Sequence, residues 1–304
     1  MTKTLAYLLL FSALLLSNCR NHSGRVSSPA GINSSGLYEI SPEIVIPYLP
    51  AQLYETSGLE IFNGLFWTMN DSGGNAAIFG FDPASGEIKQ IVRITNAENN
   101  DWESLAADDQ NIYIGDFGNN YGRRRDLTIY IIRKLDIPDA GNGSVEAGKI
   151  RFVYPDQNQF RFTIQHSSFD CEAFVCLNDS LYLFTKDWVN QHTGMYRVPA
   201  KPGEYVAELV DSFAADGLIS GADINEKQDK LVLLGYKDYY PFIWVFSGVH
   251  GNRLFSHNNI RINLMDVYRA QTEAIVFSGE DTVFISAEES RVPSRLYRVI
   301  LPPE

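Results

Sequence analysis

The sequence predicts an all-β fold, a five-bladed β-propeller made of four-stranded antiparallel blades. Five similar tracts support this prediction, and each leads into an apolar stretch that suits a strand. They read SGLEI, ESLAA, EAFVC, SGADI and EAIVF, and begin at Ser57, Glu103, Glu172, Ser220 and Glu273. Their starts lie 46 to 69 residues apart, and a strand-rich repeat of about this length is typical of one propeller blade. The many aromatic, valine and isoleucine residues also suit pleated, half-buried sheets.

Four strands can be assigned to each of the first four repeats, with glycine, asparagine and aspartate in the turns between them. The first repeat has strands at 57–62, 65–71, 77–82 and 87–94, and the second at 103–108, 112–117, 128–135 and 149–156. The third has strands at 172–177, 181–187, 194–199 and 204–210, and the fourth at 220–225, 230–236, 242–247 and within 258–264.

The fifth repeat supplies only three strands, at 273–278, 282–289 and 295–301. An unused apolar segment, EIVIPYLP at 43–50, lies at the other end of the domain. Pairing this segment beside the last three strands would cover an exposed sheet edge and close the ring. We therefore predict that both termini build the last blade. Because the interval from Glu103 to Glu172 is the longest, a sixth, degenerate blade within it is the alternative architecture.

The first 19 residues have the features of an export signal. Lys3 precedes an apolar run from Leu5 to Leu16, which is too short for a membrane-spanning helix. The residues Leu16-Ser17-Asn18-Cys19 that end the segment resemble a bacterial lipobox, which implies cleavage before Cys19 and lipidation of its thiol. An ordinary secretory signal cleaved nearby is the alternative.

Residues 20–36 are rich in serine, glycine and asparagine and predict a flexible tether, so that residues 37–304 form the propeller domain. We therefore expect an exported protein that is anchored by lipid to a bacterial membrane and faces the periplasm or the cell surface. The formal net charge of −12 argues against a nucleic-acid partner and against a basic membrane-binding patch.

Two cysteines, Cys171 and Cys176, remain for the folded domain. Residues five apart in one strand lie about 17 Å from each other and on opposite faces, which is too far for a disulfide. We expect two buried thiols.

The first residue of each repeated tract should lie near the propeller axis, at the mouth of the channel where the inner strands begin. In register these residues are Ser57, Glu103, Glu172, Ser220 and Glu273. Three carboxylates and two hydroxyls brought together would repel one another unless a cation joined them. Ca²⁺ accepts about 6–8 oxygens in flexible geometry, so the sequence predicts a calcium site formed by these five side chains. Glu60 and Asp223 are alternative ligands, or groups that accept hydrogen bonds from the channel backbone.

The same face of the propeller should carry the loops that follow the second strands. Asp71, Asp116, Asp187 and Asp238 close these strands and are candidates for catalytic acids or bases, although aspartate is also a common turn residue. The tract GRRRD at 122–126 either binds an anionic group or forms a solvated hairpin tip, and the second interpretation is favoured.

The register of the five ring residues resembles the calcium-activated nucleotidase (apyrase) family, whose central ligands run Ser, Glu, Glu, Ser, Glu. The segments ETSGLEIFNGLFWTMND and ESLAADDQNIYIGDFG carry the likeness most strongly. The resemblance implies a five-bladed propeller with one Ca²⁺ on the axis, held by Ser57, Glu103, Glu172, Ser220 and Glu273. The family has an acidic residue after its first ring serine, where this chain has Gly58. NDSGG and DWESLA also resemble bacterial phytase-like and SdiA-regulated propellers.

Two functions are consistent with these features. The first is a calcium-dependent hydrolase of phosphate esters or anhydrides, which acts on a small anionic substrate at the upper face. The second is a non-catalytic propeller in which calcium is structural and the upper face binds a ligand or a partner protein. Because fold and metal site do not determine a reaction, both remain open at this point.

Overall fold

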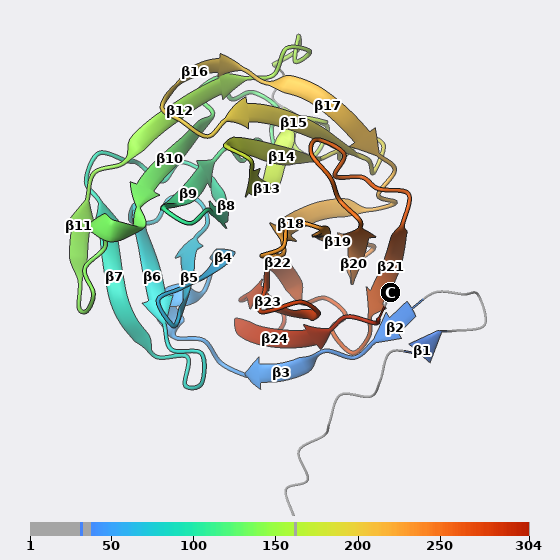
Figure 1. Cartoon of the computed structure of the whole chain (residues 1–304), viewed down its shortest axis with the longest axis horizontal. Coiled ribbons are helices and arrows are strands. Elements are labelled where there is room, and N and C mark those ends of the chain that lie inside the picture. The colour runs from blue at the N-terminus through green and yellow to red at the C-terminus, as the bar shows by residue number, and fades with distance from the viewer. Residues whose placement is uncertain (1–30, 33–37, 161–162, 304) are drawn as a thin grey trace, which may run out of the picture.

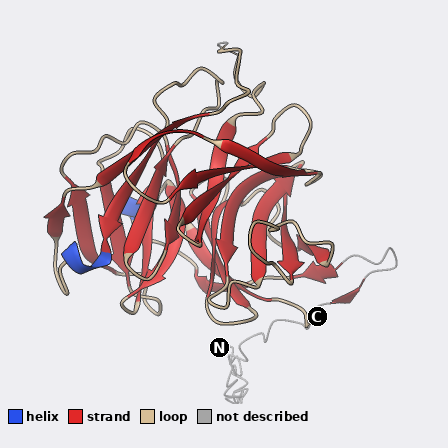
Figure 2. Ribbon diagram, turned by 45° about the horizontal axis from the view of Figure 1, so that its top comes forward, coloured by secondary structure: helices blue, strands red, loops and turns tan. Residues whose placement is uncertain are grey.

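The computed structural model describes residues 31–32, 38–160 and 163–303 of the 304-residue chain. Within these residues the strands form five sheets around a central axis, which confirms the five-bladed β-propeller (Figure 1). Helix is limited, in the same residues, to the short 3-10 turns η1 (Ala51–Leu53) and η2 (Lys134–Asp136) (Figure 2). The signal segment predicted for residues 1–19, lipidation at Cys19, and residues 20–30 of the tether lie outside the described residues.

Blades 1 to 4 each contain four antiparallel strands in chain order. Blade 5 contains three such strands and is completed by a strand from the N-terminal side. In every blade the first strand of the repeat is innermost. Blade 1 contains β4 (Thr56–Phe62), β5 (Leu65–Asn70), β6 (Ala77–Phe81) and β7 (Ile88–Ile94). Blade 2 contains β8 (Trp102–Ala107), β9 (Asn111–Asp116), β10 (Thr128–Arg133) and β12 (Gly148–Val153). Blade 3 contains β13 (Asp170–Leu177), β14 (Ser180–Lys186), β15 (Thr193–Pro199) and β17 (Glu208–Phe213).

The last two blades complete the ring. Blade 4 contains β18 (Leu218–Ile224), β19 (Lys230–Lys237), β20 (Tyr240–Ser247) and β21 (Asn259–Leu264). Blade 5 contains β22 (Gln271–Phe277), β23 (Thr282–Glu288), β24 (Arg295–Ile300) and β3 (Glu43–Ile46).

The strand β3 closes blade 5 from the N-terminal side, as the sequence predicted. It pairs antiparallel with β24, with Ile46 opposite Leu296 and Glu43 opposite Arg298. An ion pair joins the side chains of Glu43 and Arg298 across the two strands. Ile46 and Leu296 are buried in the same cluster, so closure also contributes to the core between blades 5 and 1.

Three further strands lie parallel to the outer edges of blades 1, 2 and 4. Those on blades 1 and 2 come from connections within the following blade, and the one on blade 4 precedes the strand that closes blade 5. They are β11 (Gly143–Val145) on β7, β16 (Gly203–Val206) on β12, and β2 (Tyr38–Ile40) on β21. The short strand β1 (Gly31–Ile32), within the predicted tether, pairs with β2.

The long second interval is explained by these connections, and the described residues contain no sixth blade. Part of the extra length forms β11, which joins blade 1. The segment 204–210, expected as one strand of blade 3, divides at Ala207 because β16 pairs with blade 2 and β17 with blade 3. Neighbouring blades are therefore joined by backbone hydrogen bonds as well as by packing.

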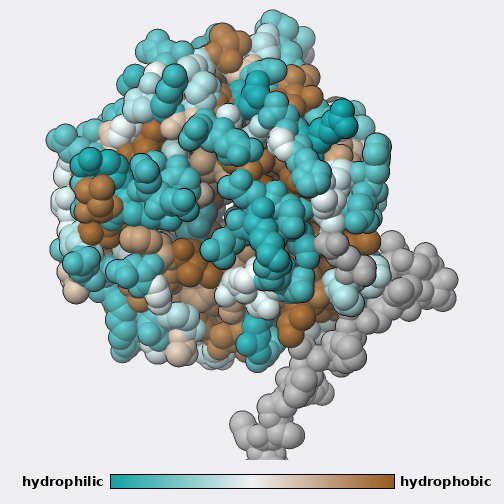
Figure 3. All heavy atoms as spheres, viewed as in Figure 1, coloured by the Kyte–Doolittle hydropathy of each residue, from teal (hydrophilic) through white to brown (hydrophobic). Residues whose placement is uncertain are grey.

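The hydrophobic core lies between the blades. Within the described residues, five clusters of buried side chains each join two neighbouring blades. Trp67 of blade 1 and Trp102 of blade 2 are fully buried in one of them, and Phe117 meets Phe174 edge-on in the next, with ring centroids 5.2 Å apart. Each blade therefore depends on its neighbours to cover its faces. On the face shown in Figure 3, mainly hydrophilic residues surround the central hollow.

Every inner strand departs from regular pairing at its repeated tract. In β8, β13, β18 and β22 the ladder omits one residue, which is Glu103, Glu172, Ser220 or Glu273. In β4 the irregularity falls between Ser57 and Glu60. A β-bulge leaves one residue out of the ladder and redirects its side chain. The bulges therefore give the repeated tracts a common geometry.

The two remaining cysteines agree with the expectation. Cys171 and Cys176 are both buried in β13 and neither forms a disulfide. Burial raises the pKa of the Cys171 thiol, which keeps it protonated and unreactive.

Candidate functional site

A cavity of about 420 Å³ occupies one mouth of the channel. We call this end, where the inner strands begin and the second strands end, the upper mouth. Its lining comes from all five blades and their connections. The residues are Asp71, Glu103, Asn120, Gln165, Glu172, Lys186, Trp188, Tyr236, Tyr239, Arg269, Ala270, Gln271, Glu273, Ser290 and Arg291. We refer to this cavity as the upper pocket.

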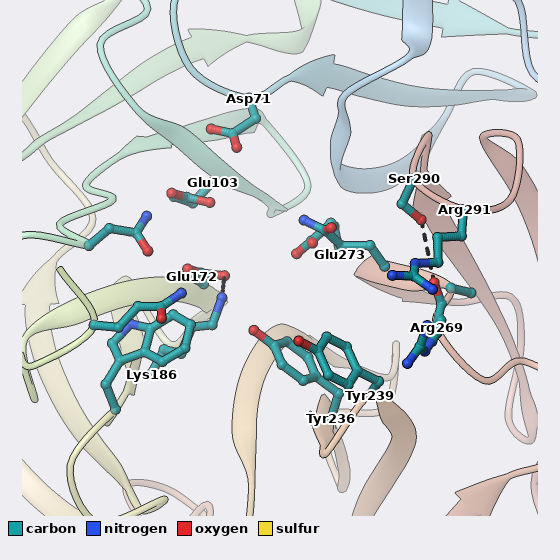
Figure 4. Close-up of a pocket in the computed structure, with 15 residues that line it drawn as sticks. Asp71, Glu103, Glu172, Lys186, Tyr236, Tyr239, Arg269, Glu273, Ser290 and Arg291 are labelled. Atoms are coloured by element: carbon teal, nitrogen blue, oxygen red, sulfur yellow. Dashed lines mark hydrogen bonds and ion pairs between the residues drawn. The ribbon is translucent and has the colours of Figure 1, made fainter.

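The structure brings the three predicted glutamate ligands together. Glu103, Glu172 and Glu273 all line the upper pocket, and each is at most 8% exposed. Figure 4 shows Glu103 and Glu172 on one side of the pocket and Glu273 facing them. Burial raises the pKa of each carboxyl, that of Glu273 to about 7. Placing three carboxylates in one buried pocket needs protons or a cation to balance the charge.

The two predicted serine ligands have a different role in this structure. Ser57 Oγ donates to the backbone carbonyl of Glu103, at 2.6 Å, and Ser220 Oγ donates to that of Thr272, at 2.8 Å. Both serines are buried, and neither lines the upper pocket. Each hydroxyl therefore joins its blade to the next at the bulge, where the ladder provides fewer partners.

Gly58 explains why no acidic residue follows the first ring serine. Its backbone has φ +67°, and an added Cβ would lie 2.6 Å from the backbone nitrogen of Leu105. A side chain at this position would be strained and would also collide with the backbone of blade 2. The acidic residue that the resemblance to the nucleotidase family implies here therefore has no room.

Lys186 is a site residue that the sequence reasoning missed. Its ammonium group lies 2.6 Å from Oε2 of Glu172, and both side chains are almost fully buried. Nζ also lies over the rings of Trp188 and Tyr236, 4.8 and 5.3 Å from their centroids. Burial raises the pKa of Glu172, and Lys186 opposes that shift. One positive charge of the protein is therefore already placed among the ring carboxylates.

A tighter acidic cluster lies beside this ion pair. Asp71, Asp101 and Glu103 can each place one carboxylate oxygen so that the three lie within 4.8 Å of one another. Burial is the largest cause that raises the pKa of Asp71 to about 6 and that of Asp101 to about 7. Gly118 packs against the cluster so closely that an added Cβ would lie 2.1 Å from Oε1 of Glu103. A side chain at this position would therefore displace these carboxylates.

Glu103 is the most buried carboxylate of this cluster and has no partner in the described part of the chain. Its side chain is 6% exposed, and within the described residues no hydrogen bond or ion pair reaches its carboxylate. Buried polar groups without partners are rare in native proteins and call for an explanation such as an ion. The arrangement of Asp71, Asp101 and Glu103, all oxygen donors, suits a hard divalent cation.

Of the four aspartates proposed as catalytic, only Asp71 lines the upper pocket. Asp116 accepts hydrogen bonds from Asn100, from the backbone of Asp101 and from Arg124. Asp187 caps the turn that follows it, through the backbone nitrogens of Val189 and Asn190.

Asp238 is exposed in the turn between β19 and β20, where its φ is +51°. This is the ordinary turn role of aspartate.

The tract Gly122–Asp126 does not offer a set of unpaired arginines. Arg124 pairs with both Asp116 and Asp126, and its guanidinium also donates to the carbonyl of Gly118. It therefore fixes the loop beside the acidic cluster, which is a structural role.

The wall facing the acidic cluster is basic and aromatic. Figure 4 shows Arg269, Arg291 and Ser290 on this side, with Tyr236 and Tyr239 along the adjoining wall. Neither arginine was singled out from the sequence, because the two come from different connections. The pocket thus has Asp71, Glu103 and Glu172 at one side and guanidinium groups at the other, with the carboxylate of Glu273 between them.

The opposite, lower mouth of the channel contains Glu60 and Asp223. Asp223 accepts hydrogen bonds from the backbone nitrogens of Ile224 and Phe277, at 2.8 and 2.6 Å, as one of the two sequence interpretations proposed. Burial raises the pKa of Asp223 to about 7. Burial and then the charge of Asp223 raise the pKa of Glu60.

Comparisons with known proteins show no family for this chain. No protein-family model and no curated protein matches the chain. Similar solved structures include a proposed 6-phosphogluconolactonase from Bacteroides uniformis, at 12% identity and TM-score 0.42, covering 88% of this chain and 72% of that one. A nidogen/laminin complex matches at 14% identity and TM-score 0.41, covering 80% and 82%. The Dos1 propeller matches at 12% and 0.39, covering 91% and 63%.

These likenesses are too distant to bear on function. The class that the structure defines is a five-bladed β-propeller with an acidic pocket at one channel mouth. The resemblance to the nucleotidase and phytase-like families remains a prediction from sequence.

Proposed function

We propose that the upper pocket binds Ca²⁺ and that the protein is a calcium-dependent hydrolase of phosphate esters or anhydrides. The observation that supports this most directly is the cluster of Asp71, Asp101 and Glu103, whose oxygens approach within 4.8 Å of one another. Glu103 is the strongest member because it is buried without a partner. Asp101 was not among the ligands proposed from sequence, and Asp71 was proposed there as a catalytic group.

The proposed ligand set differs in part from the ring of five. Asp71, Asp101 and Glu103 would hold the ion. Glu273 lines the same cavity. Glu172 is held by Lys186, and the hydroxyls of Ser57 and Ser220 donate to backbone carbonyls. A bound Ca²⁺ would polarise a phosphoryl oxygen and orient water.

The protein's own groups would support that chemistry. Lys186 pairs with Glu172 and fixes it in place, and the two arginines provide positive charge on the opposite wall. Arg124 holds Asp116 and the backbone of Gly118 beside the ligands, which limits their movement. Residues that orient ligands in this way commonly tune a metal site.

A non-catalytic binding propeller with structural calcium is the second candidate. One observation favours it: three of the four proposed catalytic aspartates, Asp116, Asp187 and Asp238, do not line the pocket. The upper pocket would then bind a small ligand or a partner protein without turning it over.

Calcium titration and an activity assay of the same protein separate these candidates. Saturating a site at about 100 times its Kd stabilises the folded state by about 2.7 kcal/mol, which raises the melting temperature. We expect this rise in the wild type and in Glu146→Gln, an exposed control. It should be lost in Asp101→Asn and Glu103→Gln.

The activity panel should contain nucleoside diphosphates, nucleoside triphosphates and simple phosphate esters. Calcium-dependent turnover that is lost in the same two variants supports the hydrolase. Calcium stabilisation without turnover of any substrate supports the binding propeller. A melting temperature that calcium leaves unchanged contradicts the metal site itself.

We further propose that the chain is exported and anchored to a bacterial membrane by lipid on Cys19. The support is the apolar run and the lipobox-like sequence before this residue. Replacing Cys19 by serine should release the protein from the membrane fraction of an expressing bacterium. Retention of Cys19→Ser in that fraction would contradict the anchor.

A further inference from the structure

The basic wall of the upper pocket contains two arginines that the protein leaves without ion pairs. Within the described residues no carboxylate lies within ion-pair distance of Arg269 or Arg291. In the same residues Arg124, Arg133 and Arg298 form ion pairs, whereas Arg93, Arg125 and Arg253 do not. What distinguishes Arg269 and Arg291 is that both line one cavity that they share with the ring carboxylates.

Arg269 is also held in a conformation that its local sequence does not favour. Its backbone has φ +65°, in the left-handed region, and no glycine or asparagine occupies the position. The backbone nitrogen of Arg269 donates to the carbonyl of Tyr239, and Ser290 Oγ donates to the carbonyl of Arg269. Non-glycine residues in this region are strained, and such strain is often found at binding sites.

The side chain of Arg269 is oriented by aromatic rings. The guanidinium carbon lies 5.0 Å from the ring centroid of Tyr268 and 5.6 Å from that of Tyr239. Tyr268 itself packs on Tyr240, with centroids 4.5 Å apart. These contacts restrict rotation of the planar group before any ligand binds.

One donor of this guanidinium is unsatisfied. The Nε atom of Arg269 is sealed from solvent and has no hydrogen-bond partner in the described residues. Because Nε is covered, a ligand in the pocket would meet the Nη end of the group. A strained backbone and an unpaired charge at one pocket residue indicate that binding, rather than stability, accounts for its placement.

We propose that Arg269 is an oriented fork for an oxyanion of the ligand, a carboxylate or phosphoryl group, with Arg291 as a second positive charge. A planar guanidinium donates two parallel hydrogen bonds to such a group, which a lysine does not reproduce. The inference rests on the proposed function in one respect, that this anion belongs to the substrate of the calcium site. The substrate then spans the pocket, from Arg269 on one wall toward Asp71 and Glu103 on the other.

The matched variants are Arg269→Asn and Arg269→Lys. Asparagine tolerates the left-handed backbone and removes the fork, so Arg269→Asn should melt at the same temperature as the wild type or higher. Lysine keeps the charge and removes the fork. Arg151→Gln, an exposed position on β12, is the control.

The probes are inorganic phosphate and acetate, titrated by calorimetry with the calcium-loaded and the calcium-free protein. We expect at least one probe to bind, about tenfold more weakly in both Arg269 variants and unchanged in Arg151→Gln. Preference for phosphate would identify a phosphoryl group, and preference for acetate a carboxylate. Equal affinity in Arg269→Lys and wild type, or binding of neither probe to the wild type, would overturn the fork.

Calcium binding distinguishes this proposal from the proposed function. If Arg269→Asn binds calcium like the wild type and loses the anion, both stand. If calcium fails to bind while the anion still depends on Arg269, the hydrolase proposal falls and the fork remains. If calcium binds and anion affinity does not depend on Arg269, the proposed role of Arg269 is wrong and the calcium proposal is unaffected.

Discussion

The ammonium group of Lys186 lies 2.6 Å from Oε2 of Glu172, and both side chains are almost completely buried in the upper pocket. A pair of this kind gives the pocket one fixed positive charge among several carboxylates. Glu172 is therefore the ring residue whose charge the protein balances by itself.

Removing the lysine should destabilise the protein strongly. Lys186→Met leaves Glu172 buried without its partner, and breaking a buried pair in this way costs about 3–5 kcal/mol. We expect that loss in urea unfolding. The double variant Lys186→Met/Glu172→Gln should recover much of it, because no unpaired charge remains. Equal stability of the single and double variants would contradict the role of the pair.

The hydroxyl of Ser57 should contribute to the cohesion of blades 1 and 2. Ser57→Ala removes its donation to the carbonyl of Glu103, which leaves a buried acceptor without that partner. The expected cost is about 1–3 kcal/mol in chemical unfolding. Ser144→Ala, at an exposed position of β11, should change stability by less than about 0.5 kcal/mol. Equal effects of the two substitutions would refute the inter-blade role.

Gly58 should not tolerate the acidic residue that the nucleotidase resemblance implies. A left-handed backbone costs a non-glycine residue about 1–2 kcal/mol, and the approach to Leu105 adds a steric term. Gly58→Asp and Gly58→Ala should therefore both lower the melting temperature. Gly64→Ala has a similar positive φ in open space, so it isolates the backbone strain and should cost less than Gly58→Ala. A gain of stability in Gly58→Asp would show that the channel can accommodate the family pattern.

Glu60 at the lower mouth should make stability depend on pH. Burial, and then the charge of Asp223, raise its pKa, so the folded state holds this proton more tightly than the unfolded chain does. The stabilisation is full below the ordinary carboxyl pKa and declines as pH rises toward the folded pKa. Glu60→Gln does not titrate, so it should gain stability relative to the wild type more at pH 8 than at pH 5.

Thermal unfolding at both pH values measures this difference. Glu146→Gln serves as the exposed control. A difference between Glu60→Gln and wild type that is the same at pH 5 and pH 8 would mean that Glu60 titrates alike in both states.

The repeats predicted the blades because each blade uses the same local pattern of an inner strand and three hairpin-linked strands. The ring register was predictable for the same reason, since a bulge recurs at Glu103, Glu172, Ser220 and Glu273. Asp101 had a local signal that was overlooked. It lies two residues before Glu103, as Asp170 lies two residues before Glu172.

Other features had no local signal. Arg269 precedes β22 and Arg291 lies between β23 and β24, so only the pairing of these strands in blade 5 brings the two into one cavity. In the pairing register, Lys186 lies where blades 4 and 5 have Tyr236 and Glu288, so nothing in the repeat marks it. The division of residues 204–210 between two blades likewise depends on a neighbouring sheet edge rather than on the segment itself.

Closure by β3 also determines when the protein can fold. Ile46 of β3 pairs with Leu296 of β24, and Tyr38 of β2 pairs with Ile262 of β21. The strands β2 and β3 therefore cannot pair until these much later strands have been synthesised. At about 5–20 residues per second, the chain between them takes on the order of 10–50 s to make. Contacts this distant in sequence also form slowly. Blades 4 and 5 therefore reach their final form only after β21 and β24 have been made and can pair with β2 and β3.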